Sequence, residues 1–437
     1  MEPTLTPESI PSRAVAGRGS SLTRRQALGV LGGLALPWPE LLAQTRSTSA
    51  APAAVPGPGA TSAASTVPPA RADLPNFEGL MEWLARDNSP RLSFLDEKWR
   101  SLEAWKQAAR PVFRHALSYQ PTAKPLAADV IGREERRDFT VERVNIHATE
   151  AYHIPARVLI PKRREGRLPA VVAMHCHSGR YVWGHEKVLS HPDDSAALTE
   201  FRNAAYGRPW AEVLAQRGYV VIVTDAFYFG ERRLRIEDMP PQRVASEAEL
   251  LTAINRVCSS YEHLTAKTLF TTGITWPGLH VWDDMRTVDY LATRPEVDPE
   301  RIGCAGLSIG GLRTAHLIAA DARIKAASIT GWMTRFAYQL RNHLRNHTWM
   351  IYIPGLYRSL DFPDAAALHA PGALLVQQCS RDQLYPLEAM KGAVDQLTRI
   401  YAKAGIPERF RGTFHDEPHS FKPHMQDETF DWLDRWL

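Results

Sequence analysis

The chain has 437 residues, of which 44% are hydrophobic and 23% charged, a composition typical of a globular protein. Its formal net charge of +4 is small for this length, and no Lys/Arg cluster comes with interleaved aromatics, so no nucleic-acid partner is expected. The mixed-sign run 133–139 is typical of solvated surface. Outside the N-terminal region no segment is apolar enough to cross a bilayer, and the oligomeric state stays open.

The N-terminal region has the pattern of an export signal followed by a spacer. Arg24 and Arg25 precede an apolar run of roughly a dozen residues, too short for a stable membrane span. The pattern resembles a twin-arginine signal, although Ala27 stands where that pattern prefers Phe. We therefore expect a signal over 1–44 and a periplasmic or extracellular protein. Residues 45–74 are rich in Ala, Pro, Ser and Thr, which predicts a disordered linker.

The remaining chain predicts a helical segment followed by one large catalytic domain. Helical spacing over 75–124, broken by Pro90 and Pro111, predicts two or three helices packed on the core. Over 125–437, apolar strands then alternate with amphipathic helices. Strands are predicted at 138–146, 154–161, 168–175, 219–226, 301–308, 324–332, 372–379 and 408–416. Helices are predicted at 206–218, 280–295, 310–321, 388–405 and 426–437. This alternation predicts an α/β fold, with a mostly parallel central sheet and helices on both faces. Reactive residues of such folds follow the strands, at their carboxyl ends.

The stretch 304–311, Cys-Ala-Gly-Leu-Ser-Ile-Gly-Gly, places Ser308 between a predicted strand and a predicted helix. This context is typical of a nucleophile elbow, a strained turn that exposes the serine Oγ. Gly306 and Gly310 remove side chains that would clash there, and the N–H of Ile309 is placed to face a developing oxyanion. Nucleotide-binding folds also use glycine-rich turns, but neither of their usual glycine patterns occurs in the expected context. Ser308 is therefore the predicted nucleophile.

A serine nucleophile needs a base, and the base needs a carboxylate that orients it. In sheets of this kind the order along the chain is Ser, Asp or Glu, then His. Asp382 follows the predicted strand 372–379, which places it at the correct end of the sheet. His419 is preferred as the base because it lies in the loop after the last strand, whereas His415 falls at the end of that strand. The predicted triad is Ser308, Asp382 and His419.

The loop after the first predicted parallel strand supplies the second oxyanion donor. The backbone N–H of His177 is the preferred donor, and that of Cys176 is the alternative. No third ligand accompanies the His-x-His pair at a recognised spacing, and His343 and His347 lack an H-E-x-x-H core, so no metal is expected. His343 and His347 are interpreted as lid or packing residues. Their aromatic-rich segment, 341–364, is expected to cover part of the site.

These stretches resemble the α/β-hydrolase superfamily, specifically bacterial hydrolases near acetyl xylan esterases and dienelactone hydrolases. The resemblance covers about residues 125–437 and rests on MHCHSG, GHEKV, DAFYFGERR, CAGLSIGG, SRDQLYP and PHSF. It implies Ser308 as nucleophile, Asp382 as acid, His419 as base and no cofactor. Cys176 departs from the family's oxyanion segment, where a Gly is common. Dienelactone hydrolases proper use a cysteine nucleophile, so the serine here favours ester hydrolysis.

Other residues of the matching segments receive structural or pocket roles. Glu231, Arg232 and Arg286 are interpreted as partners in salt bridges that brace the loops. Trp332 follows the strand after the elbow helix and should lie near the mouth of the site. It and Cys176 are the candidate substrate-pocket residues, with core packing as the alternative for Trp332.

The sequence thus predicts an exported serine carboxylic-ester hydrolase of acetyl xylan esterase type, which acts through an acyl-enzyme on a small-molecule or polysaccharide ester. One alternative is a prolyl oligopeptidase-like peptidase, but such enzymes generally carry a large gating domain. The other is a catalytically silent hydrolase fold that serves as a binding protein, which loss of a triad member would mark. The acyl and alcohol parts of the substrate stay open.

Overall fold

The computed structural model describes residues 72–437, apart from 123–124, 164 and 237–245. The export signal predicted at 1–44 and nearly all of the linker predicted at 45–74 lie outside the described residues. Within the described part of the chain, no helix combines the length and the apolar character that a membrane span requires.

Two helices precede the sheet, α1 (Glu78–Asp87) and α2 (Leu102–Ala116). Helix α2 contacts α7 (Ile309–Ala320), and it buries three apolar residues at a spacing of four, Trp105, Ala109 and Phe113. This spacing gives a helix one apolar stripe, which here faces the core. Helix α1 buries no residue.

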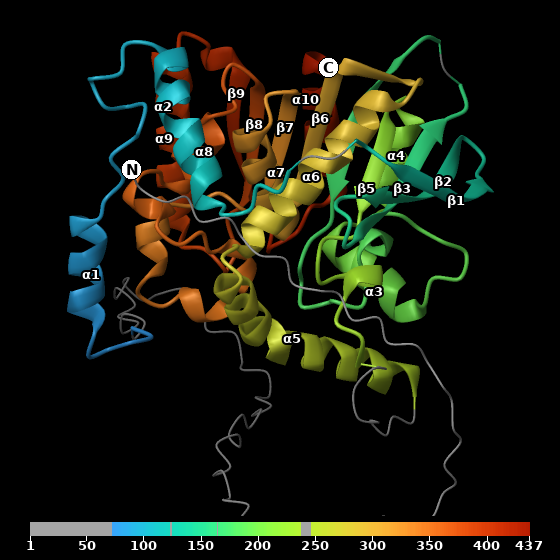
Figure 1. Cartoon of the computed structure of the whole chain (residues 1–437), viewed down its shortest axis with the longest axis horizontal. Helices are drawn as coiled ribbons and strands as arrows, with labels where there is room; N and C mark the ends of the chain where they lie inside the picture. Colours follow the sequence, from blue (N-terminus) through green and yellow to red (C-terminus); the bar gives the residue numbers. More distant parts are fainter. Residues whose placement is uncertain (1–71, 123–124, 164, 237–245) are drawn as a thin grey trace, which may run out of the picture. The chain divides into compact units, whose positions relative to one another are not determined.

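A nine-stranded sheet forms the centre of the domain, in the order β1-β2-β3-β5-β4-β6-β7-β8-β9 (Figure 1). Its strands are β1 (Ala128–Glu135), β2 (Phe139–His147), β3 (His153–Pro161), β4 (Leu168–Met174), β5 (Val220–Thr224), β6 (Val297–Leu307), β7 (Ile324–Thr330), β8 (Ala373–Cys379) and β9 (Phe410–His415). The pairs β1–β2, β2–β3 and β3–β5 are antiparallel, and the five pairs from β5 to β9 are parallel. The predicted mostly parallel sheet is confirmed.

Helices cover both faces of the sheet, also as predicted. Helices α4 (Trp210–Gln216) and α10 (Pro423–Trp436) pack on one face, and α6 (Trp276–Thr293) and α7 pack on the other (Figure 1). Strands β5 and β8 are buried at every residue because they are covered on both sides. The core therefore consists of two apolar layers separated by the sheet.

Several elements differ from the sequence prediction. Helix α4 starts at Trp210 rather than 206, because Gly207 takes a left-handed φ of 76° and Pro209 follows it. Helix α6 starts at Trp276, four residues before the predicted start, where the Thr275 hydroxyl accepts a hydrogen bond from Gly278 N–H at 3.0 Å. Strand β1 and three helices, α3 (Ala196–Ala205), α5 (Glu247–Thr271) and α8 (Phe362–Ala367), were not predicted.

The remaining elements lie toward the C-terminus and in the loops. The helices are α8 (Phe362–Ala367) and α9 (Leu387–Lys403). The short 3-10 turns are η1 (His185–Lys187), η2 (Gly230–Arg232), η4 (Phe336–Gln339), η5 (Leu344–Asn346), η6 (Trp349–Ile351), η7 (Leu356–Arg358) and η8 (Pro407–Arg409). Four of these turns lie between 336 and 358, and this segment contains no α-helix and no strand.

Candidate active site

Ser308 forms a strained turn between β6 and α7. Its backbone has φ 60° and ψ −119°, a conformation that residues other than glycine rarely adopt. The turn is tight because the chain crosses itself closely. A Cβ on Gly306 would come 2.6 Å from the carbonyl carbon of Gly310, and a Cβ on Gly310 would overlap the carbonyl oxygen of Met174. Both glycines are therefore required by close backbone approach, as expected of an elbow.

Asp382 and His419 lie in the loops after β8 and β9, and their side chains are hydrogen-bonded. His419 Nδ1 is 2.5 Å from Asp382 Oδ2, and the Asp382 side chain is fully buried. Leu384 N–H donates to the other carboxylate oxygen at 2.8 Å, which fixes the plane of the carboxyl group. Among the described residues, His419 Nε2 has no hydrogen-bond partner. His415 instead bonds Glu428 at 3.1 Å, away from Asp382.

Ser308 and His419 line one cavity of about 220 Å³. Its wall also contains Ile309, Trp332 and three residues of the loop after β4, His177, Ser178 and Gly179. The segment 341–364 contributes Asn346, His347, Thr348 and Ile351, so it forms part of the wall, as expected. The fold thus gathers the predicted nucleophile, base, both predicted oxyanion residues and Trp332 around one space.

Cys176 lies behind this wall, which corrects the expectation that it faces the pocket. The residue is fully buried and does not line the cavity. Its N–H donates to the hydroxyl of Tyr206 at 2.9 Å, so it is not free to bind an oxyanion. The neighbouring His177 does line the cavity. Of the two donors considered from the sequence, the geometry favours His177.

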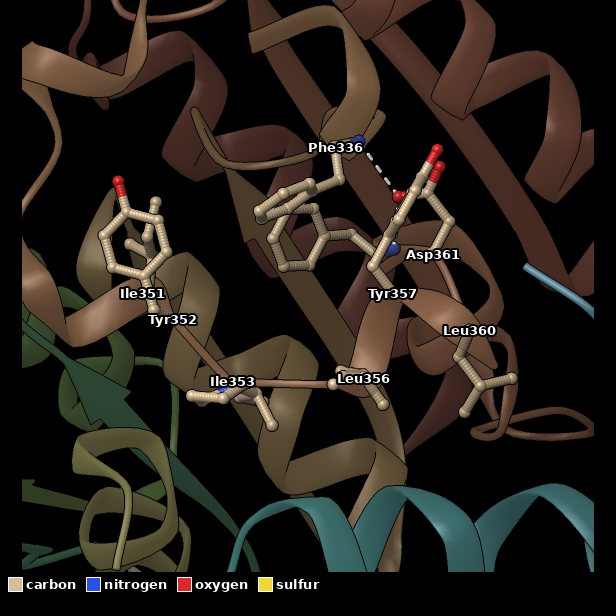
Figure 2. A pocket seen from close by; sticks show the side chains of 11 residues that line it. Phe336, Ile351, Tyr352, Ile353, Leu356, Tyr357, Leu360 and Asp361 are labelled. Atoms are coloured by element: carbon tan, nitrogen blue, oxygen red, sulfur yellow. Dashed lines mark hydrogen bonds between the residues drawn. The ribbon is translucent and has the colours of Figure 1, made fainter. Parts of the chain in front are cut away.

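Trp332 combines the two roles considered for it. Its side chain is 1% exposed and packs edge-on against Phe362 and Tyr385, at ring centroid distances of 5.2 and 5.6 Å. Its indole nitrogen has no hydrogen-bond partner in the part of the chain that the structure describes. A second cavity of about 250 Å³ shares Ile351 with the first and is also lined by Phe336, Asp361 and Phe362, and Phe336 N–H donates to the Asp361 carboxylate at 3.0 Å (Figure 2).

Part of the sequence matches a known protein family, and the structure is similar to those of known esterases. Residues 206–339, which include the elbow, match the dienelactone hydrolase family. The structure is similar to that of a candidate acetyl xylan esterase from Bacteroides fragilis NCTC 9343, with 17% identity, a TM-score of 0.60 and coverage of 77% of this chain and 81% of that one. It is also similar to a glucuronoyl esterase from Solibacter usitatus, with 15% identity, a TM-score of 0.57 and coverage of 79% and 97%. The chain has the α/β-hydrolase fold.

The chain also has a relative in sequence. YtaP, a candidate hydrolase of Bacillus subtilis (strain 168), is 25% identical over 318 residues, which are 72% of this chain and 95% of that protein. Together with the dienelactone hydrolase match, this relationship supports a hydrolase that acts on ester bonds.

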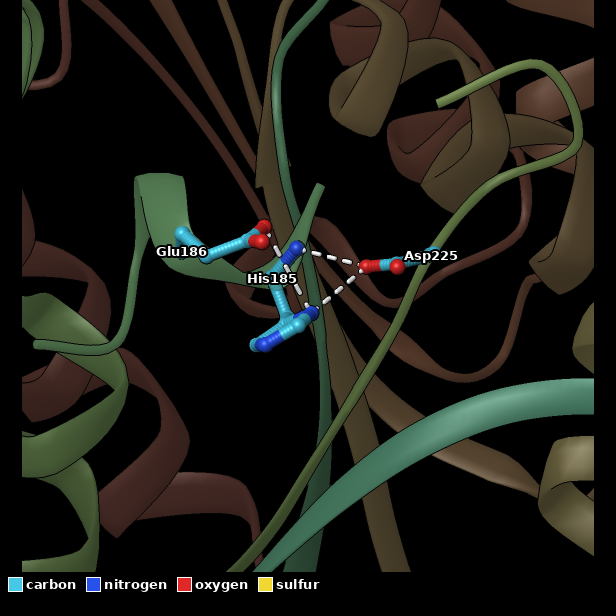
Figure 3. A group of neighbouring side chains, drawn as sticks. All are labelled: His185, Glu186 and Asp225. Atoms are coloured by element: carbon cyan, nitrogen blue, oxygen red, sulfur yellow. Dashed lines mark hydrogen bonds and ion pairs between the residues drawn. The ribbon is translucent and has the colours of Figure 1, made fainter. Parts of the chain in front are cut away.

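A buried carboxylate holds together the loops that follow β4 and β5. Asp225, directly after β5, accepts a hydrogen bond from His185 N–H at 2.7 Å (Figure 3). It also accepts one from Glu231 N–H at 2.9 Å. Burial opposes its ionisation, but the His185 imidazole at 2.8 Å outweighs that and holds the pKa of Asp225 well below its usual range. His185, Glu186 and Asp225 lie close enough to hold a metal ion, but their mutual bonds account for the cluster.

The predicted salt bridges that brace a loop are present for Glu231 and Arg232, whereas Arg286 pairs within its own helix, α6, so this pair braces no loop. Glu231 pairs with Arg157 at 2.7 Å, Arg232 with Asp283 at 2.6 Å, and Arg286 with Asp289 at 2.6 Å. None of these six residues lines the catalytic cavity, which agrees with a structural role.

Glu262, on α5, is the residue near the site that sequence reasoning missed. Its carboxylate accepts hydrogen bonds from Tyr181 at 2.7 Å and Thr348 at 2.9 Å, and it lies 2.8 Å from His177 Nε2. Burial would raise its pKa, but the hydrogen bonds from His177, Tyr181 and Thr348 lower the pKa below its usual value. Glu262 thus ties the loop after β4 to the segment 341–364. A lone Glu in a long helix carries no sequence signal for such a role.

Proposed function

We propose that this chain is a serine carboxylic-ester hydrolase in which Ser308, His419 and Asp382 form the catalytic triad. The observation that carries the proposal is which partners the two ring nitrogens of His419 have. One of its nitrogens is bound to the buried Asp382, and the other has no partner among the described residues and belongs to a ring that lines the same cavity as Ser308. A base with one oriented side and one open side, next to a strained serine, is what acyl transfer requires.

The proposed reaction has two halves. His419 Nε2 takes the Ser308 proton as Oγ attacks the ester carbonyl carbon, and the N–H groups of Ile309 and His177 stabilise the oxyanion. The imidazolium then gives its proton to the departing alcohol, which leaves an acyl-serine. In the second half a water oxygen attacks the acyl carbon while His419 takes a proton from that water. The bond between Ser308 Oγ and the acyl carbon then breaks, Oγ takes the proton from His419, and the carboxylic acid departs. Asp382 accepts the hydrogen bond from His419 Nδ1–H and so orients the imidazole throughout.

The substrate that we propose is an ester on a polysaccharide, carrying an acetyl or methyl group. Two residues of the cavity wall, Trp332 and His347, each have a buried ring nitrogen without a partner among the described residues, and a small side-chain movement would let these nitrogens bind oxygens of such a ligand. Burial lowers the pKa of His347 to about 4, so its ring is neutral at pH 7. The likeness to carbohydrate esterases adds support for this substrate class.

Purified protein is expected to hydrolyse p-nitrophenyl acetate with a kcat/KM on the order of 10⁴ M⁻¹ s⁻¹. A panel of acetylated xylan, methyl-esterified glucuronoxylan and feruloylated arabinoxylan then identifies the acyl and alcohol parts by the acid or alcohol released. Activity on the acetyl or methyl esters is expected to exceed activity on the feruloyl ester. Release of p-nitrophenol at no more than the buffer rate would contradict the proposal.

We further propose that the protein is exported, because Arg24 and Arg25 precede a short apolar run. Replacing both arginines by lysine keeps the charge, yet we expect it to retain the protein in the cytoplasm, since a twin-arginine signal requires the arginine pair. The measurement is the fraction of ester hydrolase activity in periplasm and medium of expressing cells. Equal export of both forms would show that the pair does not act as the signal.

A further inference from the structure

Lys187 is a buried charge that the proposed mechanism does not use. It lies in η1, its side chain is fully buried, and no carboxylate of the described residues forms an ion pair with it. Its ammonium donates instead to two main-chain carbonyls, that of Cys176 at 2.8 Å and that of His177 at 3.2 Å. The Phe229 ring lies 4.5 Å from the same nitrogen.

These two carbonyls determine where the next N–H groups point. In a trans peptide the C=O and the following N–H lie in one plane and point in opposite directions. The only cis peptide bond in the described chain precedes Pro371, so the peptides after Cys176 and His177 are trans. Because both carbonyls point at Lys187, the N–H groups of His177 and Ser178 point away from it. His177 and Ser178 line the catalytic cavity and Lys187 does not, so these N–H groups face the cavity side.

The other side of the oxyanion hole is fixed to the same loop by backbone contact. Gly310, in the first turn of α7, approaches the carbonyl oxygens of Met174 and His175 so closely that no Cβ fits. The N–H of Ile309, one residue before Gly310, is therefore held next to the peptides that Lys187 orients. At the first position of a helix this N–H has no partner within the helix.

We propose that Lys187 is a positioning residue for the oxyanion hole: by holding the carbonyl oxygens of Cys176 and His177, it directs the N–H of His177 toward an ester carbonyl at Ser308. The inference rests on the proposed esterase function. Ionising Lys187 is costly, since burial lowers its pKa to about 8 despite the opposing effect of Glu186 and Asp225. An apolar side chain of similar length would remove that cost, so the charge has another use.

The test is Lys187→Met, which keeps the length of the side chain and removes its donors. We expect kcat for p-nitrophenyl acetate to fall about 10- to 100-fold while KM changes less than threefold, because a misdirected donor weakens the transition state more than the bound ester. A phenylboronic acid, which forms a tetrahedral anion on the serine, should lose affinity by the same factor as kcat/KM. The fold should stay intact, because Cys176 O keeps its contact with His175 Nδ1 at 3.0 Å and His177 O keeps the hydrogen bond from Arg180 N–H at 3.1 Å.

Lys106→Met is the matched control, because Lys106 also donates to a main-chain carbonyl, that of Ala370 at 2.5 Å, and does not line the catalytic cavity. It should leave kcat and boronate affinity unchanged. If Lys187→Met fails to fold, Lys187→Gln, which retains one donor group, should show the same split at a smaller size. An unchanged kcat, or a rise in KM alone, would overturn the role of Lys187. An inactive wild type would contradict the esterase function itself.

Discussion

Replacing Ser308 by alanine is expected to lower kcat/KM for p-nitrophenyl acetate by about 10⁴-fold or more. Without Oγ no acyl-enzyme forms, and only substrate binding and the oxyanion donors remain. The substitution removes one atom from a residue that is 8% exposed, and the elbow is held by backbone bonds, Ser308 N–H to Thr330 O at 2.9 Å and Leu312 N–H to Ser308 O at 2.9 Å. The thermal transition should therefore change little.

Ser328→Ala is the matched control for this variant. Ser328 is a buried serine on β7, bonded to Thr429 Oγ1 at 2.8 Å, and it does not line the catalytic cavity. Its loss should cost about 1 kcal/mol of stability and leave the rate unchanged. A Ser308→Ala enzyme within tenfold of the wild-type rate would mean that another residue is the nucleophile.

Gly310→Ala should damage both stability and activity. The added methyl group would overlap the carbonyl oxygen of Met174 and lie 2.9 Å from its carbonyl carbon, and a backbone carbonyl cannot rotate out of the way as a side chain can. Strand β4 and helix α7 must therefore separate. We expect a loss of about 3 kcal/mol in the free energy of unfolding and at least a 100-fold loss in kcat, since Ile309 and His177 donors would move apart. Chemical denaturation and steady-state kinetics measure the two effects.

Gly79→Ala serves as the comparison, because Gly79 also lies in a helix, α1, and a Cβ there meets nothing within 4 Å. Alanine favours a helix by about 1 kcal/mol over glycine, so this variant should be as stable as the wild type or more so. Equal behaviour of the two variants would show that the close approach at Gly310 is relieved without consequence.

The sheet and the candidate triad were accessible from sequence because each depends on local pattern. An interior parallel strand such as β8 reads as a continuous apolar run, since helices cover both of its faces. Asp382 and His419 could be selected because reactive residues of such sheets follow strands. The hydrogen bond between them is a result of tertiary structure that the strand pattern anticipates without stating its geometry.

The missed elements have charged or polar residues that conceal their pattern. Strand β1 ends inside the mixed-sign run 133–139, whose first three residues it contains. It is an edge strand that pairs with β2 among the described strands, and charge is tolerated at a sheet edge. Helix α5 buries Asn255 and Glu262 among its apolar residues, so its apolar stripe is interrupted. Lys187 is similar: a lysine is expected on the surface, and only the folded loop supplies the carbonyls that hold it.

The central claim, that Ser308 is an activated nucleophile, is tested most directly by reaction with a fluorophosphonate probe followed by intact and peptide mass spectrometry. The expected result is one adduct per chain, located on Ser308, absent from Ser308→Ala and retained in Ser328→Ala. Labelling that persists in Ser308→Ala, or a folded wild-type protein that takes up no probe, would contradict the claim.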